Sequence, residues 1–348
     1  MAETRNNEAF YFQWHITERC NNDCKHCYSR GKRLTEETTM ESFLDILADI
    51  VVICKRWKRD IHIALVGGDP LLHRHFLRFV QILHERSTIR ISVAGNPETL
   101  APSLMEWLKE RIFAFQVSID GIQRTHDWFR YPGSYEATLN CLREAKQRGL
   151  RTHVMTTVSR RNVKQLVDIM HTVYEVGATH WTFGRYVPPV GMTNDIVEPE
   201  EFREVLIAVE EAHRQYEKKH SRLTKEPLLF PLRNLYCPPD ISDNPERRQV
   251  EGCGIGSLAL TILPNNTIMA CRRHSGSVLG RWEKTGDLLD IFLHSPIIKK
   301  LRNIEEIKRC KDCVFLYHCR GCRAVGHAIR GDLTDPDPSC PFFTRKEG

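Results

Sequence analysis

The chain has 348 residues, of which 41% are hydrophobic and 27% charged, and its net charge is +6. This length allows one large domain of about 200–250 residues and a smaller one. The modest positive charge does not require a nucleic-acid partner, and no apolar run approaches the roughly 20 residues that a membrane span needs. Because the N-terminus is polar, unlike a signal peptide, we expect a cytoplasmic protein with no nucleic-acid or membrane partner.

Strand and helix patterns alternate through the first two thirds of the chain. The predicted strands cover residues 10–17, 61–66, 89–94, 112–119, 151–158 and 179–183. The predicted helices cover residues 39–56, 76–83, 100–108, 135–147, 163–175 and 202–218. Six strand–helix repeats predict an α/β fold with a parallel sheet and right-handed crossovers. Because a full barrel has eight repeats, we expect an open or partial barrel.

Polar and glycine-rich segments follow the predicted strands. In a parallel barrel all strand ends meet at one rim, so these segments should converge. Each also has an ordinary interpretation as a turn or loop, the Asp120-Gly121 turn included. The segments are the cysteine loop after residue 17, Gly67-Gly68-Asp69-Pro70, Asn96, Ser118 with Asp120, Asn162 and Arg185.

The remaining third has a different texture. Residues 221–251 are rich in proline and charge and are interpreted as a linker, which separates a barrel over 1–220 from a small domain over 252–348. Apolar runs at 258–263 and 267–271 flank Pro264-Asn265-Asn266 and predict a hairpin. Short helices are predicted at 287–292 and 296–303.

Cys20, Cys24 and Cys27 form a dense group directly after the first strand. Three thiolates do not complete a structural zinc site, which takes four ligands. They suit a [4Fe–4S] cluster with one iron atom open to another ligand; the alternative is a zinc-knuckle fragment. Cys54 and Cys141 lie at apolar helix positions and are interpreted as core residues.

Eight further cysteines follow residue 236, enough for two sites of four thiolates each. Their ligands could hold two iron–sulfur clusters or two structural zinc ions. The eight are Cys237, Cys253, Cys271, Cys310, Cys313, Cys319, Cys322 and Cys340.

The cysteine triplet and the Gly67-Gly68-Asp69-Pro70 segment resemble the radical S-adenosylmethionine (radical SAM) superfamily, whose Gly-Gly-Glu-Pro element here carries Asp for Glu. The resemblance covers roughly residues 10–190 and implies a partial (β/α)6 TIM-type barrel. It implies that Cys20, Cys24 and Cys27 are the catalytic cluster ligands. It also implies that SAM binds the open iron atom and contacts the Gly67–Pro70 backbone, with Asn96, Ser118 and Arg185 as further cofactor-binding candidates.

The C-terminal region resembles the SPASM extension of that superfamily, which carries two auxiliary [4Fe–4S] clusters. The resemblance implies one cluster on Cys237, Cys253, Cys271 and Cys322, and a second on Cys310, Cys313, Cys319 and Cys340. Two departures are the two-residue gap between Cys319 and Cys322, where the family usually has three residues, and Asn266 in place of a hairpin glycine. Cys237 also lies unusually far upstream.

These resemblances imply a radical SAM oxidoreductase that modifies a ribosomally made peptide or small protein, for example by a thioether or another crosslink. The alternatives are an enzyme of quinone or metal-cofactor biosynthesis and a non-catalytic zinc or cluster scaffold. A reducing partner such as flavodoxin or ferredoxin is expected. In anaerobic sulfatase-maturing enzymes an aspartate follows the second SPASM cysteine and acts as the catalytic base. Here Arg272 follows Cys271, and a guanidinium cannot act as that base.

Overall fold

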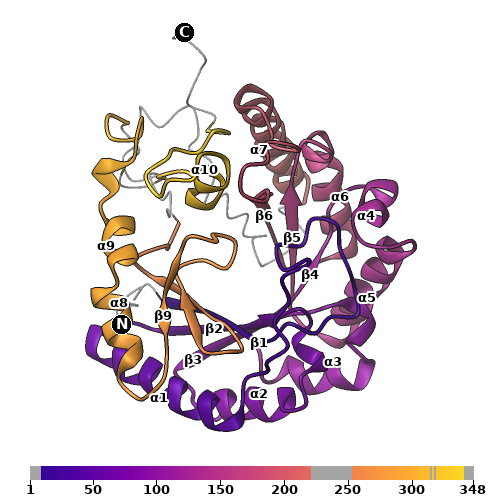
Figure 1. Cartoon of the computed structure of the whole chain (residues 1–348). Helices are drawn as coiled ribbons and strands as arrows, with labels where there is room; N and C mark the ends of the chain where they lie inside the picture. The colour runs from indigo at the N-terminus through magenta and orange to yellow at the C-terminus, as the bar shows by residue number, and fades with distance from the viewer. Residues whose placement is uncertain (1–8, 221–252, 314–315, 317–318, 341–348) are drawn as a thin grey trace, which may run out of the picture.

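The computed structural model describes residues 9–220, 253–313, 316 and 319–340 (Figure 1). The strands are β1 (Phe10–Thr17), β2 (Ile61–Gly67), β3 (Ile89–Ala94), β4 (Ala114–Ser118), β5 (Thr152–Val158), β6 (His180–Arg185), β7 (Ala259–Ile262), β8 (Thr267–Met269) and β9 (Val278–Arg281). The α-helices are α1 (Met40–Trp57), α2 (Phe76–His84), α3 (Pro102–Lys109), α4 (Gln123–Phe129), α5 (Ser134–Arg148), α6 (Leu166–Val176), α7 (Pro199–His220), α8 (Asp287–His294), α9 (Pro296–Arg302) and α10 (Arg323–Arg330).

The first six strands pair in parallel and in chain order, so the predicted α/β partial barrel is confirmed. The strands form an open arc, and the helices that connect them cover its outer side (Figure 1). The carboxyl ends of parallel strands share one edge, so the loops after β1 to β6 meet at one rim.

Side chains of β1 alternate between the two faces of the sheet. Phe12, Trp14 and Ile16 are fully buried on the helix side and belong to the main core. Because side chains in a strand alternate, Gln13 and His15 lie on the inner, concave face. The inner face therefore carries polar groups in a sheet whose outer face is apolar.

Residues at the helix ends explain where the helices stop and start. Thr39 caps α1 by accepting a hydrogen bond from the Ser42 N–H at 3.1 Å. Gly149 and Gly177 end α5 and α6 with φ of 77° and 75°, as the sequence predicts. Asn266 takes the left-handed conformation, with φ of 64°, in the β7–β8 hairpin. Asparagine tolerates that conformation better than most residues, which explains how it replaces a glycine there.

The C-terminal region continues the barrel sheet. Strand β7 pairs in parallel with β1, and β8 and β9 follow as antiparallel strands. Asp49 of α1 fastens this region: its carboxylate accepts hydrogen bonds from Trp282 Nε1 at 2.9 Å and from the Gly286 N–H at 2.8 Å. The predicted hairpin and short helices are confirmed, whereas the predicted linker lies outside the described residues.

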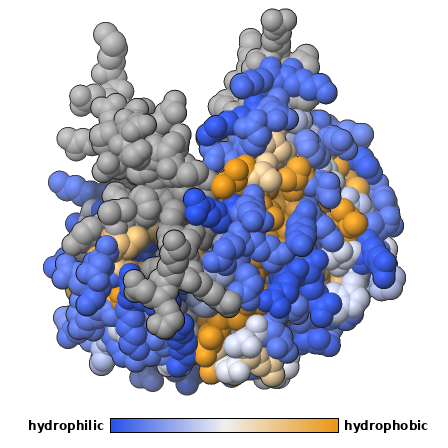
Figure 2. All heavy atoms as spheres, turned by 90° about the horizontal axis from the view of Figure 1, so that it is seen from above, coloured by the Kyte–Doolittle hydropathy of each residue, from blue (hydrophilic) through white to orange (hydrophobic). Residues whose placement is uncertain are grey.

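Seen from above, the surface is mainly hydrophilic with smaller apolar patches between (Figure 2). None of the helices in the described part of the chain has the length and apolar character that a membrane crossing requires.

Candidate active site

The loop between β1 and α1 carries Cys20, Cys24 and Cys27 as half-buried free thiols. Asn96, which follows β3, and Arg130, at the end of α4, point N–H groups at these sulfurs. Asn96 Nδ2 donates to Cys20 Sγ at 3.4 Å, and Arg130 Nη1 donates to Cys24 Sγ at 3.9 Å. Hydrogen bonds to sulfur are a recognised means of tuning iron–sulfur clusters. The residues present therefore fit a cluster held by three thiolates.

The geometry also bears on the kind of metal site. Within the described residues, no three His, Cys, Asp or Glu side chains converge tightly enough to hold a single metal ion. A cubane cluster has a different requirement, because each thiolate binds a different iron atom.

A buried ion pair lies against this loop. The Asp120 carboxylate accepts hydrogen bonds from Arg130 Nε at 2.8 Å and from the Thr157 N–H at 2.8 Å, and His26 Nε2 lies 3.3 Å away. Burial alone would raise the pKa of Asp120, but Arg130 and His26 outweigh burial and hold the pKa well below its usual range. The Asp120 carboxylate is thus occupied by partners within the protein.

The predicted glycine segment packs against the start of the cysteine loop. A Cβ atom on Gly67 would lie 1.9 Å from the Thr17 carbonyl oxygen, and one on Gly68 would lie 2.3 Å from the Arg19 carbonyl oxygen. Only glycine permits these approaches. The buried Asp69 carboxylate accepts from Thr99 Oγ1 at 2.6 Å and from the Leu71 N–H at 3.1 Å. Its side chain therefore has a structural role, while SAM binding by the Gly67–Pro70 backbone stays a prediction.

The three remaining candidate residues at the rim lie in different surroundings. Asn96 lies against Cys20, as described above. Ser118 ends β4 half-buried, in register with Met155. Arg185 ends β6 fully buried and pairs with Asp337, close to the thiols of Cys319, Cys322 and Cys340. Arg185 thus lies with the C-terminal cysteines, which differs from the SAM contact expected of it.

The C-terminal cysteines fall into neighbouring sets. Burial, together with the nearby Cys271 and Cys322, raises the pKa of Cys253 to about 11. Burial likewise raises the pKa of Cys310 to about 11, with additional effects of Cys313 and Cys319. These neighbours match the two ligand groups that the SPASM resemblance implies, although ligation itself stays a prediction. Cys237 lies outside the described residues.

Arg272 joins the two cysteine regions. Its Nε donates to Glu18 Oε1 at 3.1 Å and its Nη2 donates to Ser29 Oγ at 3.2 Å. Glu18 is buried two residues before Cys20, and Arg272 directly follows Cys271. The neighbouring Arg273 donates to the Arg185 carbonyl at 3.3 Å. The hairpin that carries Cys271 is therefore fastened to the cysteine loop and to β6.

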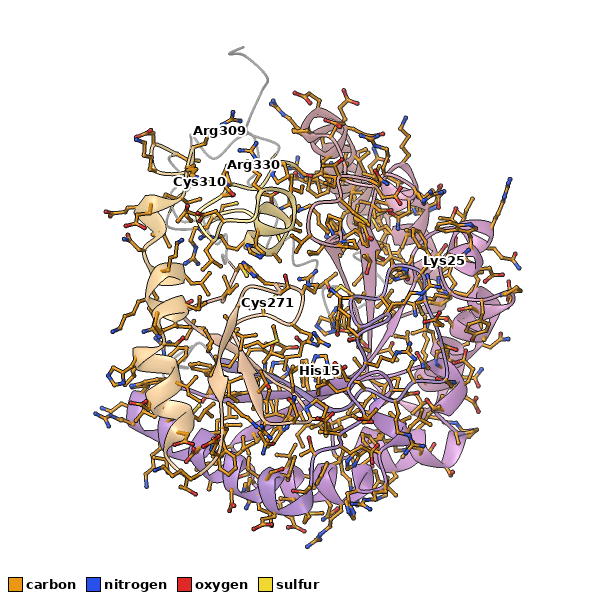
Figure 3. The ribbon with its side chains drawn as sticks, in the orientation of Figure 1. His15, Lys25, Cys271, Arg309, Cys310 and Arg330 are labelled. Atoms are coloured by element: carbon orange, nitrogen blue, oxygen red, sulfur yellow. The ribbon has the colours of Figure 1, made fainter. Side chains whose placement is uncertain are left out.

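His15 occupies the inner face of β1 beneath this contact (Figure 3). Its ring is fully buried, and neither ring nitrogen has a hydrogen-bond partner among the described residues. Burial, assisted by Arg272, lowers the pKa of His15 to about 3, so the ring is neutral at physiological pH.

Sequence reasoning missed Glu18 and Arg130. The signal for Glu18 is weak: a single acidic residue directly after β1. Arg130 follows the seven-residue helix α4, which is too short to show a helical period.

Fold and site together give a partial barrel with three cysteine thiols at its rim, an arrangement that suits an iron–sulfur cluster. Residues 14–173 match the family described as the radical SAM superfamily. This part of the chain is therefore a radical SAM domain, and such a domain implies a [4Fe–4S] cluster and SAM as cofactors.

Full-length relatives carry several activities. The chain is 27% identical to the AdoMet-dependent heme synthase of Methanosarcina barkeri, over 96% of this chain and 97% of that protein. It is 23% identical to the mycofactocin maturase MftC of Mycolicibacterium smegmatis, over 94% and 81%. The crystal structure of Streptococcus suis SuiB bound to S-adenosylmethionine superposes with a TM-score of 0.71 at 14% identity, over 96% of this chain and 77% of that one. This last similarity concerns the fold.

Proposed function

We propose that this radical SAM enzyme oxidatively modifies a substrate bound where the barrel rim meets the C-terminal cysteine region, and that this region holds two auxiliary [4Fe–4S] clusters. The ion pair between Arg272 and Glu18 carries the proposal, because it links a residue adjacent to Cys271 with one two positions from Cys20. A radical formed at the rim and an electron acceptor in the C-terminal region would then border the same substrate.

The residues of the rim have distinct tasks. Cys20, Cys24 and Cys27 hold three iron atoms and leave the fourth for the amino and carboxylate groups of SAM. The Gly67–Pro70 backbone binds the SAM amino group, and Ser118 and Asn96 contact its polar groups. When bound and reduced, the cluster would supply one electron for the reductive cleavage of SAM, and SAM would supply the group that abstracts hydrogen from the substrate.

The C-terminal residues support the oxidative half of the reaction. The thiols of Cys253, Cys271 and Cys322, with Cys237, hold one auxiliary cluster, and Cys310, Cys313, Cys319 and Cys340 hold the other. When bound, these clusters supply an acceptor for the electron that the substrate radical loses, or a ligand to the substrate. Arg273 and Arg323 lie near these thiols and compensate thiolate charge.

Two substrate classes are supported by different relatives. MftC, which is named a maturase, supports a ribosomally made peptide or small protein. The heme synthase supports a metal-cofactor precursor such as a tetrapyrrole, and its similarity spans almost the whole of both chains. We place the cofactor precursor first for that reason. Arg272 excludes the aspartate-based chemistry of sulfatase maturation at this position.

Anaerobic reconstitution tests the core of the proposal. The wild-type chain should bind iron and sulfide and release 5′-deoxyadenosine from SAM when reduced. The Cys24→Ala variant should lose about four iron atoms per chain and all 5′-deoxyadenosine, because three cysteines define the site. SAM cleavage that survived in Cys24→Ala would refute the assignment.

A second measurement separates the substrate classes. An iron porphyrin with carboxylate side chains should bind the reconstituted enzyme, shift its Soret band and increase 5′-deoxyadenosine release. The absence of both effects would overturn the cofactor assignment. Deuterium transfer from a labelled candidate peptide into 5′-deoxyadenosine would then establish the peptide class.

A further inference from the structure

The cysteine loop has two sides with different surroundings. On one side, Glu18 and Ser29 are covered by Arg272 from the C-terminal region. On the other side, Lys25 lies next to α4, away from Cys271 (Figure 3). The Arg272 side of the loop is therefore in contact with the C-terminal region, while Lys25, on the other side, is exposed to solvent.

The cysteine loop is rich in basic residues, of which Arg19 pairs with Glu37, and Arg30 and Arg33 pair with Asp23. Residues 19–33 contain five basic side chains and one acidic one, Asp23, which gives +5 − 1 = +4 in a chain whose net charge is +6. Four of the five basic residues are exposed and the fifth is half-buried. The five are Arg19, Lys25, Arg30, Lys32 and Arg33.

An exposed tryptophan lies at the edge of this basic surface. Trp128 of α4 is 42% exposed, and its ring has two cations over it: Lys25 Nζ at 4.0 Å and Arg161 Cζ at 4.3 Å from the ring centroid. Such contacts fix the orientation of an exposed indole. Tryptophan and arginine are the residue types that most often dominate protein–protein binding energy.

Aromatic contacts continue from this tryptophan to the cluster ligands. The Trp128 ring packs edge-on against buried Phe129 at 5.1 Å, and Phe129 packs edge-on against His26 at 4.8 Å. His26 is the residue before Cys27, and the Lys25 N–H donates to the Phe129 carbonyl at 2.8 Å. A protein bound over Trp128 would therefore lie a few side chains from the cluster.

We propose that this surface, formed by Lys25, Trp128, Arg161 and the basic residues of the cysteine loop, is the docking site of an acidic one-electron carrier protein of the flavodoxin or ferredoxin type. The proposal rests on the cluster assignment in the proposed function. One electron leaves the reduced carrier, which is oxidised, and the cluster is reduced from the 2+ to the 1+ state. No bond is made or broken, and no proton is required.

Charge complementarity favours an acidic protein as the partner of this basic surface. Steering by opposite charge raises association rates by about 10–1000-fold at low salt and is weakened by added salt. An acidic carrier gains this attraction on the solvent side without competing with a substrate on the Arg272 side.

The test follows cluster reduction in the reconstituted full-length enzyme by stopped-flow absorbance and freeze-quench electron paramagnetic resonance. The donors are flavodoxin hydroquinone and, as a small uncharged reductant, photoreduced 5-deazariboflavin. With flavodoxin, the rate constant should fall as salt rises, and Lys25→Glu should lower it about tenfold at low salt. With 5-deazariboflavin both proteins should be reduced equally fast.

Two further variants keep the outcome decisive. Arg161→Glu lies outside the cysteine loop, so it should slow cluster reduction by flavodoxin without affecting cluster assembly. Lys55→Glu, an exposed residue near the end of α1 and so at the opposite edge of the barrel, should change neither rate. If the rate of cluster reduction by flavodoxin is independent of salt, of Lys25→Glu and of Arg161→Glu, the docking site is overturned. The same holds if these two variants only raise the substrate KM. A wild-type protein without a reducible cluster would instead refute the proposed function.

Discussion

The two cysteine regions balance their buried charges differently. Beside the N-terminal loop, Arg130 pairs with Asp120 and Arg272 pairs with Glu18. Beside the C-terminal cysteines, Arg323 is buried without a hydrogen-bond partner on any guanidinium nitrogen within the described part of the chain. Arg185 pairs with Asp337 through one nitrogen, while its Nε and Nη1 have no partner there.

An uncompensated buried guanidinium is costly, so something anionic should complete its surroundings. The thiols of Cys310 and Cys253 lie near Arg323, and those of Cys319, Cys322 and Cys340 lie near Arg185. A [4Fe–4S] cluster with four thiolates is anionic and would supply that charge. The charges beside the N-terminal loop are thus balanced within the polypeptide, whereas those beside the C-terminal cysteines would be balanced by the proposed clusters.

The largest expected difference separates Cys24→Ala from Cys319→Ala. Removing Cys24 should abolish 5′-deoxyadenosine formation. Removing Cys319 should cost auxiliary iron and substrate turnover, while SAM is still cleaved without coupling to product. Iron content and chromatographic 5′-deoxyadenosine yield measure both. If Cys319→Ala lost SAM cleavage while its N-terminal cluster signal stayed intact, the assignment of separate roles to the two cysteine regions would be wrong.

Replacing one arginine in each region tests the charge balance directly. Arg130→Met leaves the buried Asp120 carboxylate without its guanidinium partner, so the free energy of unfolding should fall by about 3–5 kcal/mol with or without metal. Arg323→Met removes an unpaired charge, and should leave the metal-free protein unchanged or more stable while the reconstituted protein loses auxiliary iron.

Urea unfolding and iron analysis read out both arginine variants. The double variant Asp120→Asn/Arg130→Met is the control and should recover part of the lost stability. If Arg130→Met and Arg323→Met destabilised the metal-free protein equally, the proposed difference in charge balance between the two cysteine regions would be wrong.

Asp49→Ala tests the junction between the regions. The substitution leaves the Trp282 indole N–H and the Gly286 N–H without their acceptor, and each unsatisfied buried donor costs about 1–3 kcal/mol. We expect a loss of about 3 kcal/mol in urea unfolding and earlier proteolysis of the C-terminal region. Asp49→Asn retains one acceptor oxygen and should lose less; an equal loss would show that charge matters more than hydrogen bonding.

Local patterns predicted much of this molecule. Apolar alternation in segments such as 10–17 and 61–66 located all six barrel strands, and the glycines at 149 and 177 located two helix ends. The cysteine spacings predicted both cysteine regions. Each of these features depends on neighbours in sequence, which is why pattern reasoning reaches them.

Contacts between distant residues were not predictable in this way. Arg272 and Glu18 are 254 residues apart, and nothing near either residue indicates the other. The pairing of β7 with β1 likewise joins the two ends of the chain, so the C-terminal region extends the barrel sheet. Arg185 stands at a strand end as expected, but the side chain turns to Asp337, because partner choice depends on packing between regions.

The smallest expected effect is the pH dependence of stability that a histidine near the N-terminal cysteine loop causes. His126 is fully buried beside Asp120, where its Nδ1 accepts a hydrogen bond from the Asp120 N–H at 3.1 Å. Burial, followed by Arg130, lowers the pKa of His126 to about 4, against about 6.5 in an unfolded chain. Between these values the unfolded state binds more protons, so stability is full above pH 6.5 and falls as the pH drops toward 4. At pH 5 this one residue should cost about 2 kcal/mol relative to pH 7, and His126→Gln should remove that part of the acid sensitivity. Urea unfolding of both proteins at pH 7 and pH 5 measures it. Parallel losses in the two proteins would mean that His126 is not the group responsible.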